Sequence, residues 1–391
     1  MKLFSFSRLG KAGGQTAAVC DIGSGSVAVG IVAFGSAGKT TVLVSERRML
    51  PPEERGKAQI IDQLKTLARE TAAAVLDQHA KRGGTPPSDI IAIVHTPWVR
   101  SETASASEQF TEPTVITESI ISETAKKAVR EETKLTVANV FERSVMRVAL
   151  SGYPTSTPEG KTSTRIDISV LQSDIKPEML SAMKEALGAV FVGRTITFQS
   201  AFFAFSIIIK ELLPNITHYT LIDVTSLATS AAVVRQGAVL EHADAEVGWR
   251  TIVMELAKIH GTTPAEALSR ARMATENTCT DALCQTVLQS LTAVEPMFVD
   301  TYGKMFSELA KVKRIPGMVI LIAPPDLGPW FSNIFSRVDF AQFAVSEQPF
   351  SVHQLWAQAL ESHIEMAPEN SEDTGIAAAA AFVHIKSRDR I

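Results

Sequence analysis

The sequence is poor in several features that define specialised classes of protein. Its three cysteines, Cys20, Cys279 and Cys284, are odd in number and lack metal-ligand spacing. We therefore expect thiols in a reducing compartment rather than a disulfide framework or a zinc site. No apolar run reaches the roughly 18 residues that cross a bilayer. Residues 1–9 are too short and too polar for a secretion signal and predict a flexible tail, so a cytoplasmic protein is expected.

An excess of positive charge is also missing. The chain has 38 basic and 42 acidic residues, a net charge of -4, and therefore no basic field that would grip nucleic acid. What is present is the composition of an ordinary globular protein, with 45% hydrophobic residues. A length of 391 residues predicts two domains or more.

An internal repeat is the most informative positive feature. Segments 17–32 and 219–234 share one pattern, in which a strand that ends in an acid is followed by a turn and a second strand. The acids are Asp21 and Asp223, and a helix follows each hairpin, at 58–81 and at 248–259. The repeat predicts an α/β protein with two duplicated mixed-sheet domains that face each other across a cleft.

The segment 86–192 between the repeats differs in composition, because it is rich in Ser, Thr and Glu. Its expected elements are a strand at 90–94, a helix at 118–131, strands around 145–150 and 165–171, and a helix that opens at Pro177, which suits a first helical position. This segment predicts an inserted subdomain. Later, a capping box at Thr263–Glu266 begins another helix, and a buried strand at 318–323 precedes a final helix from Thr374.

The first hairpin turn carries the candidate chemistry. In Asp21-Ile22-Gly23-Ser24-Gly25-Ser26, glycines let backbone N–H groups approach an anion, and the acid can hold Mg²⁺ through water. A Gly/Ser turn without a ligand is the alternative. The Gly-Lys-Thr ending of segment 35–40 is no P-loop, because Ala33 stands where that signature needs glycine. His95 and His218 lie at strand edges and are expected to be structural.

Together these features resemble the actin-like ATPase superfamily, and within it the FtsA/PilM family of cell division and pilus assembly. Asp21–Val27 is similar to the first phosphate motif of that family, and Leu221–Val239 is similar to the second. Met318–Pro325 stands where the adenosine motif belongs, and Thr374–Ala378 resembles the last connecting helix. Segment 86–192 is similar to the inserted subdomain of the family, and the match to FtsA is somewhat closer than the match to PilM.

The resemblance implies an actin-like, ribonuclease H-like fold with an inserted α+β subdomain of the SHS2 type. The implied parts are a flexible tail at 1–16, a first actin-like domain at 17–85, 193–216 and 374–391, the insert at 86–192, a second actin-like domain at 217–260 and 300–373, and a small helical subdomain at 261–299.

The resemblance also implies a site for ATP and Mg²⁺. The implied cofactor-binding residues are Asp21, Gly23, Ser24, Gly25, Ser26 and Asp223, and Asp21 would hold Mg²⁺ through water. Gln199 stands near the place where actin-like enzymes carry a water-orienting glutamine, with a purely structural role as the alternative.

Two departures from the family pattern count against ATP binding and turnover. Where the family has a Gly-Gly-Gly-Thr run that ends in an acid, this chain has Thr225-Ser226-Leu227-Ala228-Thr229-Ser230. The glycine pair of the adenosine motif is replaced by Ala323-Pro324-Pro325, which is bulkier and lacks two amide donors. A weak or inactive ATPase is therefore expected.

Three functions remain open on this fold. The main expectation is an FtsA-like scaffold in bacterial cell division. It would recruit partners such as a tubulin-like GTPase at the cytoplasmic face of the membrane, with indirect or weak membrane contact and self-polymerisation as a further expectation. The first alternative is a PilM-like adaptor of type IV pilus assembly that docks the cytoplasmic tail of a membrane protein in a groove of the insert. The second is a true ATPase or sugar kinase.

Overall fold

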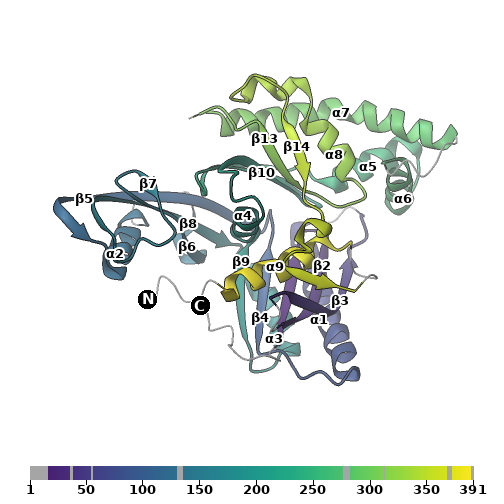
Figure 1. Ribbon diagram of the computed structural model, residues 1–391. Coiled ribbons are helices and arrows are strands. Elements are labelled where there is room, and N and C mark those ends of the chain that lie inside the picture. The colour runs from purple at the N-terminus through teal and green to yellow at the C-terminus, as the bar shows by residue number, and fades with distance from the viewer. Residues whose placement is uncertain are drawn as a thin grey trace.

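Three sheets organise the chain, and one of them projects to the side of the other two (Figure 1). The computed structural model describes residues 16–35, 38–53, 56–129, 135–275, 282–311, 313–367 and 372–388. The flexible tail was expected at residues 1–16, and residues 1–15 lie outside the described ranges. Thr16 is the first residue of β1.

The first sheet has the strand order β15-β3-β2-β1-β4-β9. Its strands are β1 (Thr16–Ile22), β2 (Ser26–Phe34), β3 (Thr40–Met49), β4 (Asp89–Val94), β9 (Thr195–Ser200) and β15 (Ile364–Met366). The helices against it are α1 (Lys57–Lys81), α3 (Pro177–Val190), α4 (Ala201–Leu212) and α9 (Thr374–Arg388). The predicted first hairpin is present as β1 and β2, and β3 extends it to a meander, with both pairs antiparallel.

Helices cover both faces of the first sheet, which explains why β1 is apolar along nearly its whole length. Ala18 and Cys20 of β1 face the core that contains α1 and α3. Ala17 and Val19 face the core that contains α4 and α9, and this core also takes in Leu221 of the second sheet. The two halves of the molecule are thus joined through α4 and α9.

The second sheet repeats the hairpin of the first, as predicted. Its order is β12-β11-β10-β13-β14. The strands are β10 (His218–Val224), β11 (Thr229–Arg235), β12 (Ala238–Ala245), β13 (Met318–Ile322) and β14 (Ser351–Gln354). The helices of this half are α5 (Trp249–His260), α6 (Pro264–Thr275), α7 (Ala282–Leu309) and α8 (Gly328–Phe335), with the short 3-10 helices η2 (Val338–Phe343) and η3 (Ala357–Leu360) nearby in sequence.

The third sheet forms the insert and has a small core of its own. Its order is β5-β8-β6-β7, with β5 (Val99–Val115), β6 (Val140–Leu150), β7 (Tyr153–Pro154) and β8 (Thr162–Ile175). Helix α2 (Glu118–Ala128) packs on β5 and β8, and η1 (Val137–Asn139) precedes β6. The insert is attached to the first sheet through a buried carboxyl group: Glu142 of β6 accepts hydrogen bonds from the hydroxyl groups of Ser173 and of Ser200, the N-cap of α4.

The insert is shorter than the expected range of 86–192. Strand β4 pairs in parallel with both β1 and β9, so it is a central strand of the first sheet. Helix α3 packs against α1, and its Met179 and Met183 belong to the same core as Ala18. Only the elements from β5 to β8 form the separate sheet. Composition changes near residue 86, but the hydrogen-bonding partners of β4 place it in the first sheet.

The cysteine expectation is wrong in one part. Cys20 is a free, buried thiol on β1, and burial, together with the charge of Asp21, raises its pKa to about 12. Cys284, by contrast, is disulfide-bonded. Within the described ranges, no helix combines the length and the apolar character needed to cross a bilayer.

Candidate functional site

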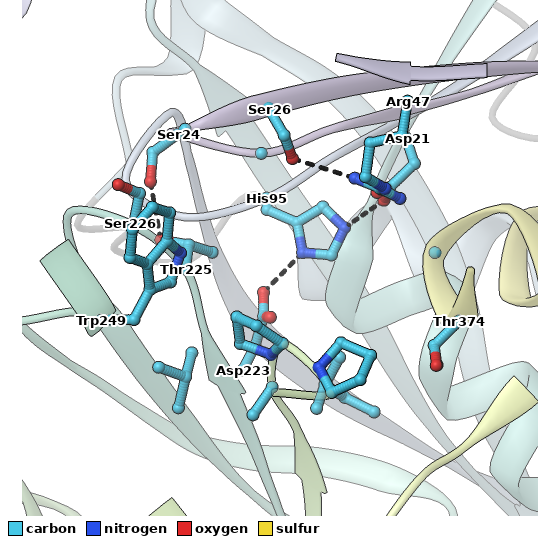
Figure 2. A pocket seen from close by; sticks show the side chains of 18 of the residues that line it. Asp21, Ser24, Ser26, Arg47, His95, Asp223, Thr225, Ser226, Trp249 and Thr374 are labelled. Carbon is cyan, nitrogen blue, oxygen red and sulfur yellow. Dashed lines mark hydrogen bonds and ion pairs between the residues drawn. The ribbon is translucent and has the colours of Figure 1, made fainter. Parts of the chain in front are cut away.

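A cavity of about 550 Å³ lies where the two halves meet (Figure 2). Its walls come from the ends of β1 and β10, the turns that follow them, the start of α5, the segment after β13 and the start of α9. The cavity brings together all six residues that the sequence nominated for cofactor binding, namely Asp21, Gly23, Ser24, Gly25, Ser26 and Asp223. Their role as ligands of a cofactor stays a prediction.

The duplicated hairpins place the two acids in equivalent positions. Asp21 is the penultimate residue of β1, opposite Ala28 in the hairpin. Asp223 is the penultimate residue of β10, opposite Ser230. Both carboxyl groups are almost completely buried, with residue exposures of 7% and 3%. Burying two acids in this way is costly unless positive partners lie close to them.

A histidine that follows β4 supplies one of those partners. His95 Nε2 lies 2.7 Å from Asp21 Oδ1, and His95 Nδ1 lies 2.7 Å from Asp223 Oδ2. Figure 2 shows the imidazole ring between the two carboxylates. Burial alone would lower the pKa of His95, but the charges of Asp223 and Asp21 outweigh burial and raise it to about 10. Both ring nitrogens therefore donate, and the ring is an imidazolium.

An arginine from β3 provides the second cation. Arg47 Nη2 donates to Asp21 Oδ2 at 2.7 Å and to Asp373 Oδ1 at 2.7 Å, and its Nε donates to Asp373 Oδ2 at 2.9 Å. Arg47 Nη1 also donates to Ser26 Oγ at 2.9 Å. Burial alone would raise the pKa of Asp21, but the charges of Arg47 and His95 outweigh it and hold the pKa well below its usual range. Both oxygens of Asp21 thus accept from a cation.

The two hairpin turns touch each other directly. Ser24 Oγ donates to Thr225 Oγ1 at 2.9 Å and accepts from the backbone N–H of Leu227 at 2.9 Å. A Cβ atom added to Gly25 would lie 2.5 Å from the Cβ of Ser226. Gly25 is therefore required by the close approach of the opposite turn. The two turns are therefore in direct contact at Gly25 and Ser226, with no gap between them at this point.

These contacts do not fit a magnesium-bound triphosphate. Mg²⁺ is usually held by carboxylate oxygens and waters, whereas both oxygens of Asp21 already accept from His95 and Arg47. A doubly protonated imidazole has no lone pair for a metal. Over the described ranges, no group of three or more His, Cys, Asp or Glu side chains is arranged to hold a metal ion.

Gln199 lies outside the cavity lining. It belongs to β9 rather than to a helix, it is 8% exposed, and its Nε2 donates to the carbonyl oxygen of Phe198 at 2.9 Å. The structure therefore does not place Gln199 where it could orient a water in the cavity.

Comparison with known proteins identifies the fold. No protein-family profile matches the chain, and no curated protein does. A solved PilM–PilN type IV pilus biogenesis complex matches with a TM-score of 0.58 and 13% identity, over 94% of this chain and 98% of that one. The chain has the actin-like ATPase fold.

Two further structures give weaker matches to this actin-like fold. The ethanolamine utilization protein EutJ from Carboxydothermus hydrogenoformans has a TM-score of 0.43 and 11% identity, over 93% of this chain and 90% of that one. A Bacteroides thetaiotaomicron protein of unknown function has a TM-score of 0.38 and 8% identity, over 94% and 96% of the two chains. The particular resemblance to FtsA gains no support from these matches.

The sequence did not point to three charged side chains of the cavity, His95, Arg47 and Asp373. His95 was expected to be structural, and no local motif marks Arg47 or Asp373. One signal was available for His95, because it directly follows a short apolar run, Ile90–Val94, which the structure shows as β4, paired in parallel with β1. The carboxyl ends of parallel strands meet at one edge of a sheet, so a polar residue there is a candidate for the same cleft as Asp21.

Proposed function

We propose that this chain is an adaptor that keeps the actin-like fold to hold a protein partner and does not turn over ATP. The observation that carries the proposal is the position of His95 between Asp21 and Asp223, with distances of 2.7 Å to each. An internal cation occupies the gap between the two acids, and the hairpin turns are joined by direct hydrogen bonds of Ser24 with Thr225 and Leu227. The closed arrangement of the two halves is therefore built into the chain.

The partner that we propose is the cytoplasmic segment of a membrane protein, as in a PilM-like adaptor. The match to a PilM–PilN complex supports this choice over the cell-division scaffold, for which no specific observation speaks. The chain would then act at the cytoplasmic face of the membrane, reached through that partner.

The insert is the proposed docking region. It projects from the two larger sheets (Figure 1) and carries exposed apolar side chains, Tyr153 at 79% and Val115 at 53%. Both residues lie towards the end of the sheet where β8 begins, because Val115 pairs with Thr162 and Tyr153 pairs with Leu150, which itself lies opposite Ile166. Exposed aromatic side chains are common anchors in protein interfaces.

The test has an enzymatic part and a binding part. Purified protein should release no phosphate from Mg-ATP above the buffer rate. Phosphate release that disappears in Asp21→Ala would refute the proposal. The binding part titrates the protein calorimetrically with the cytoplasmic segments of candidate membrane-protein partners, such as proteins of the PilN type.

A matched pair of variants locates the docking region. Tyr153→Ala should weaken binding about tenfold or more, since one interface anchor contributes on the order of 1–2 kcal/mol. Val338→Ala, at a side chain of 73% exposure in the second half, should leave binding unchanged. Equal effects of the two substitutions on binding would refute the insert as the docking region.

A further inference from the structure

We propose that the cavity binds a planar aromatic ligand that carries no negative charge, and that it rejects the phosphorylated form of the same ring system. The inference rests on the proposed function, because it takes the closed, non-hydrolysing cleft as its starting point. It adds the class of ligand that such a cleft can still accept.

The cavity persists although the hairpin turns are closed. A volume of about 550 Å³ remains beside the His95 bridge, within the range of roughly 300–1,000 Å³ that small-molecule sites occupy. Apolar side chains form part of its lining, with contributions from Met49, Trp249, Ile322, Pro324 and Pro325. Among them, the indole ring of Trp249 and the rings of the two prolines favour a flat, apolar-faced ligand.

The position of Trp249 is fixed by the same turn that closes the phosphate side. Its backbone N–H donates to the carbonyl oxygen of Thr225 at 3.0 Å, and the next N–H donates to that of Ser226 at 3.1 Å. A Cβ atom at Gly248 would lie 2.2 Å from the carbonyl oxygen of Thr225, so this glycine allows the close approach. The first turn of α5, which would otherwise offer N–H groups to an anion, is thus bonded to protein carbonyl groups.

The charge of the lining excludes an anion. Five carboxylates line the cavity, belonging to Asp21, Asp223, Asp326, Glu372 and Asp373. Three cationic groups oppose them, on Arg47, His95 and Arg272, and each is paired with a lining carboxylate. The excess of two negative charges repels a polyphosphate, and the paired cations have no free charge to offer it.

The experiment uses adenosine and ATP as probes, because they share one ring system and differ in phosphate charge. Saturation-transfer NMR and calorimetry on the full chain would give both affinities, with and without Mg²⁺. Adenosine should bind at least about tenfold more tightly than ATP at low salt. At 0.5 M salt the ATP affinity should rise while the adenosine affinity stays constant, since salt screens repulsion.

Two substitutions test the location. Ala323→Leu fills the cavity and should abolish adenosine binding. Ala341→Leu is the matched control, because Ala341 has the same 8% exposure as Ala323 and lies outside the lining. If either variant fails to fold, Glu372→Gln still tests the charge argument. Glu372 is exposed, and its neutralisation should narrow the ratio of the two affinities.

The outcomes separate this inference from the proposed function. Equal or tighter binding of ATP overturns the inference, and phosphate release in addition overturns the adaptor. If neither probe binds the native protein, the inference is overturned, while the adaptor proposal stands on its own partner test.

Discussion

Removing the imidazole ring of His95 would destabilise the protein, because this ring compensates the charges of two buried carboxylates. In His95→Ala, Asp21 keeps Arg47 as a partner at 2.7 Å. Asp223 is 3% exposed and loses the imidazolium that lies 2.7 Å from its Oδ2. In the variant, the buried carboxylate of Asp223 has no compensating cation, and it lies only the width of an imidazole ring from the carboxylate of Asp21.

The magnitude follows from the burial of both partners. Breaking a buried ion pair by deleting one partner costs about 3–5 kcal/mol, because the remaining charge stays in a poorly solvated place. With an unfolding entropy of about 2.1 cal/mol/K per residue, such a loss lowers the melting temperature of a 391-residue chain by roughly 4–6 °C. The double variant His95→Ala, Asp223→Ala should lose less than the single variant, because the uncompensated charge has then been removed as well.

Urea denaturation of the native protein and of both variants measures these differences. Addition of imidazole or of millimolar Mg²⁺ adds a second readout. Either cation can enter the gap between Asp21 and Asp223 in His95→Ala and should raise its midpoint. The native protein should show no such response to these concentrations, because His95 fills the gap.

Two results would contradict the reasoning. A His95→Ala protein within about 1 kcal/mol of the native stability would mean that the bridge contributes little beyond an ordinary contact. A double variant less stable than the single one would mean that Asp223 stabilises the fold through partners other than His95.

Three further predictions follow from the same contacts. The pKa of His95 is raised from 6.5 to about 10, so its stabilising contribution is complete below about pH 6.5 and is lost as the pH rises through 10; thermal unfolding of His95→Ala should lack this decline. The pKa of Glu142 is raised from 4.5 to about 7, mainly by burial, so the free energy of unfolding should fall by about 3 kcal/mol as the pH rises from 4.5 to 7. Glu142→Gln should remove this fall, and identical pH profiles of the native protein and the variant would contradict the prediction. Gly25→Ala should destabilise by about 1–3 kcal/mol in urea because of the contact with Ser226, and Ser226→Gly should restore most of the loss. Gly23→Ala is the control, since its added Cβ would lie 3.6 Å from the nearest atom, and an equal loss there would exclude the steric explanation.

Local patterns predicted much of the architecture. Both hairpins, the helices after them and the start of α6 at Pro264 carry their signals within short windows, and the structure has each of them. Strand β5 was missed because its alternating small residues, such as Ala104 and Ala106, resemble a Ser/Thr-rich loop more than a strand. Its partner β8 lies far along the chain, and pairing with β8 is what makes β5 a strand.

The sequence by itself determined the duplicated frame and the equivalent positions of Asp21 and Asp223, because each acid ends a strand whose pattern is local. Only the tertiary structure decided what lies between them. His95 is 74 residues from Asp21 and 128 residues from Asp223, and it meets both because β4 pairs with β1 and the two halves close on each other. The surroundings of Gly25 were also decided by the tertiary structure. In the sequence this glycine suggested a phosphate-binding turn, but in the folded chain Ser226 of the opposite turn lies directly against it, and no local pattern carries information about that turn.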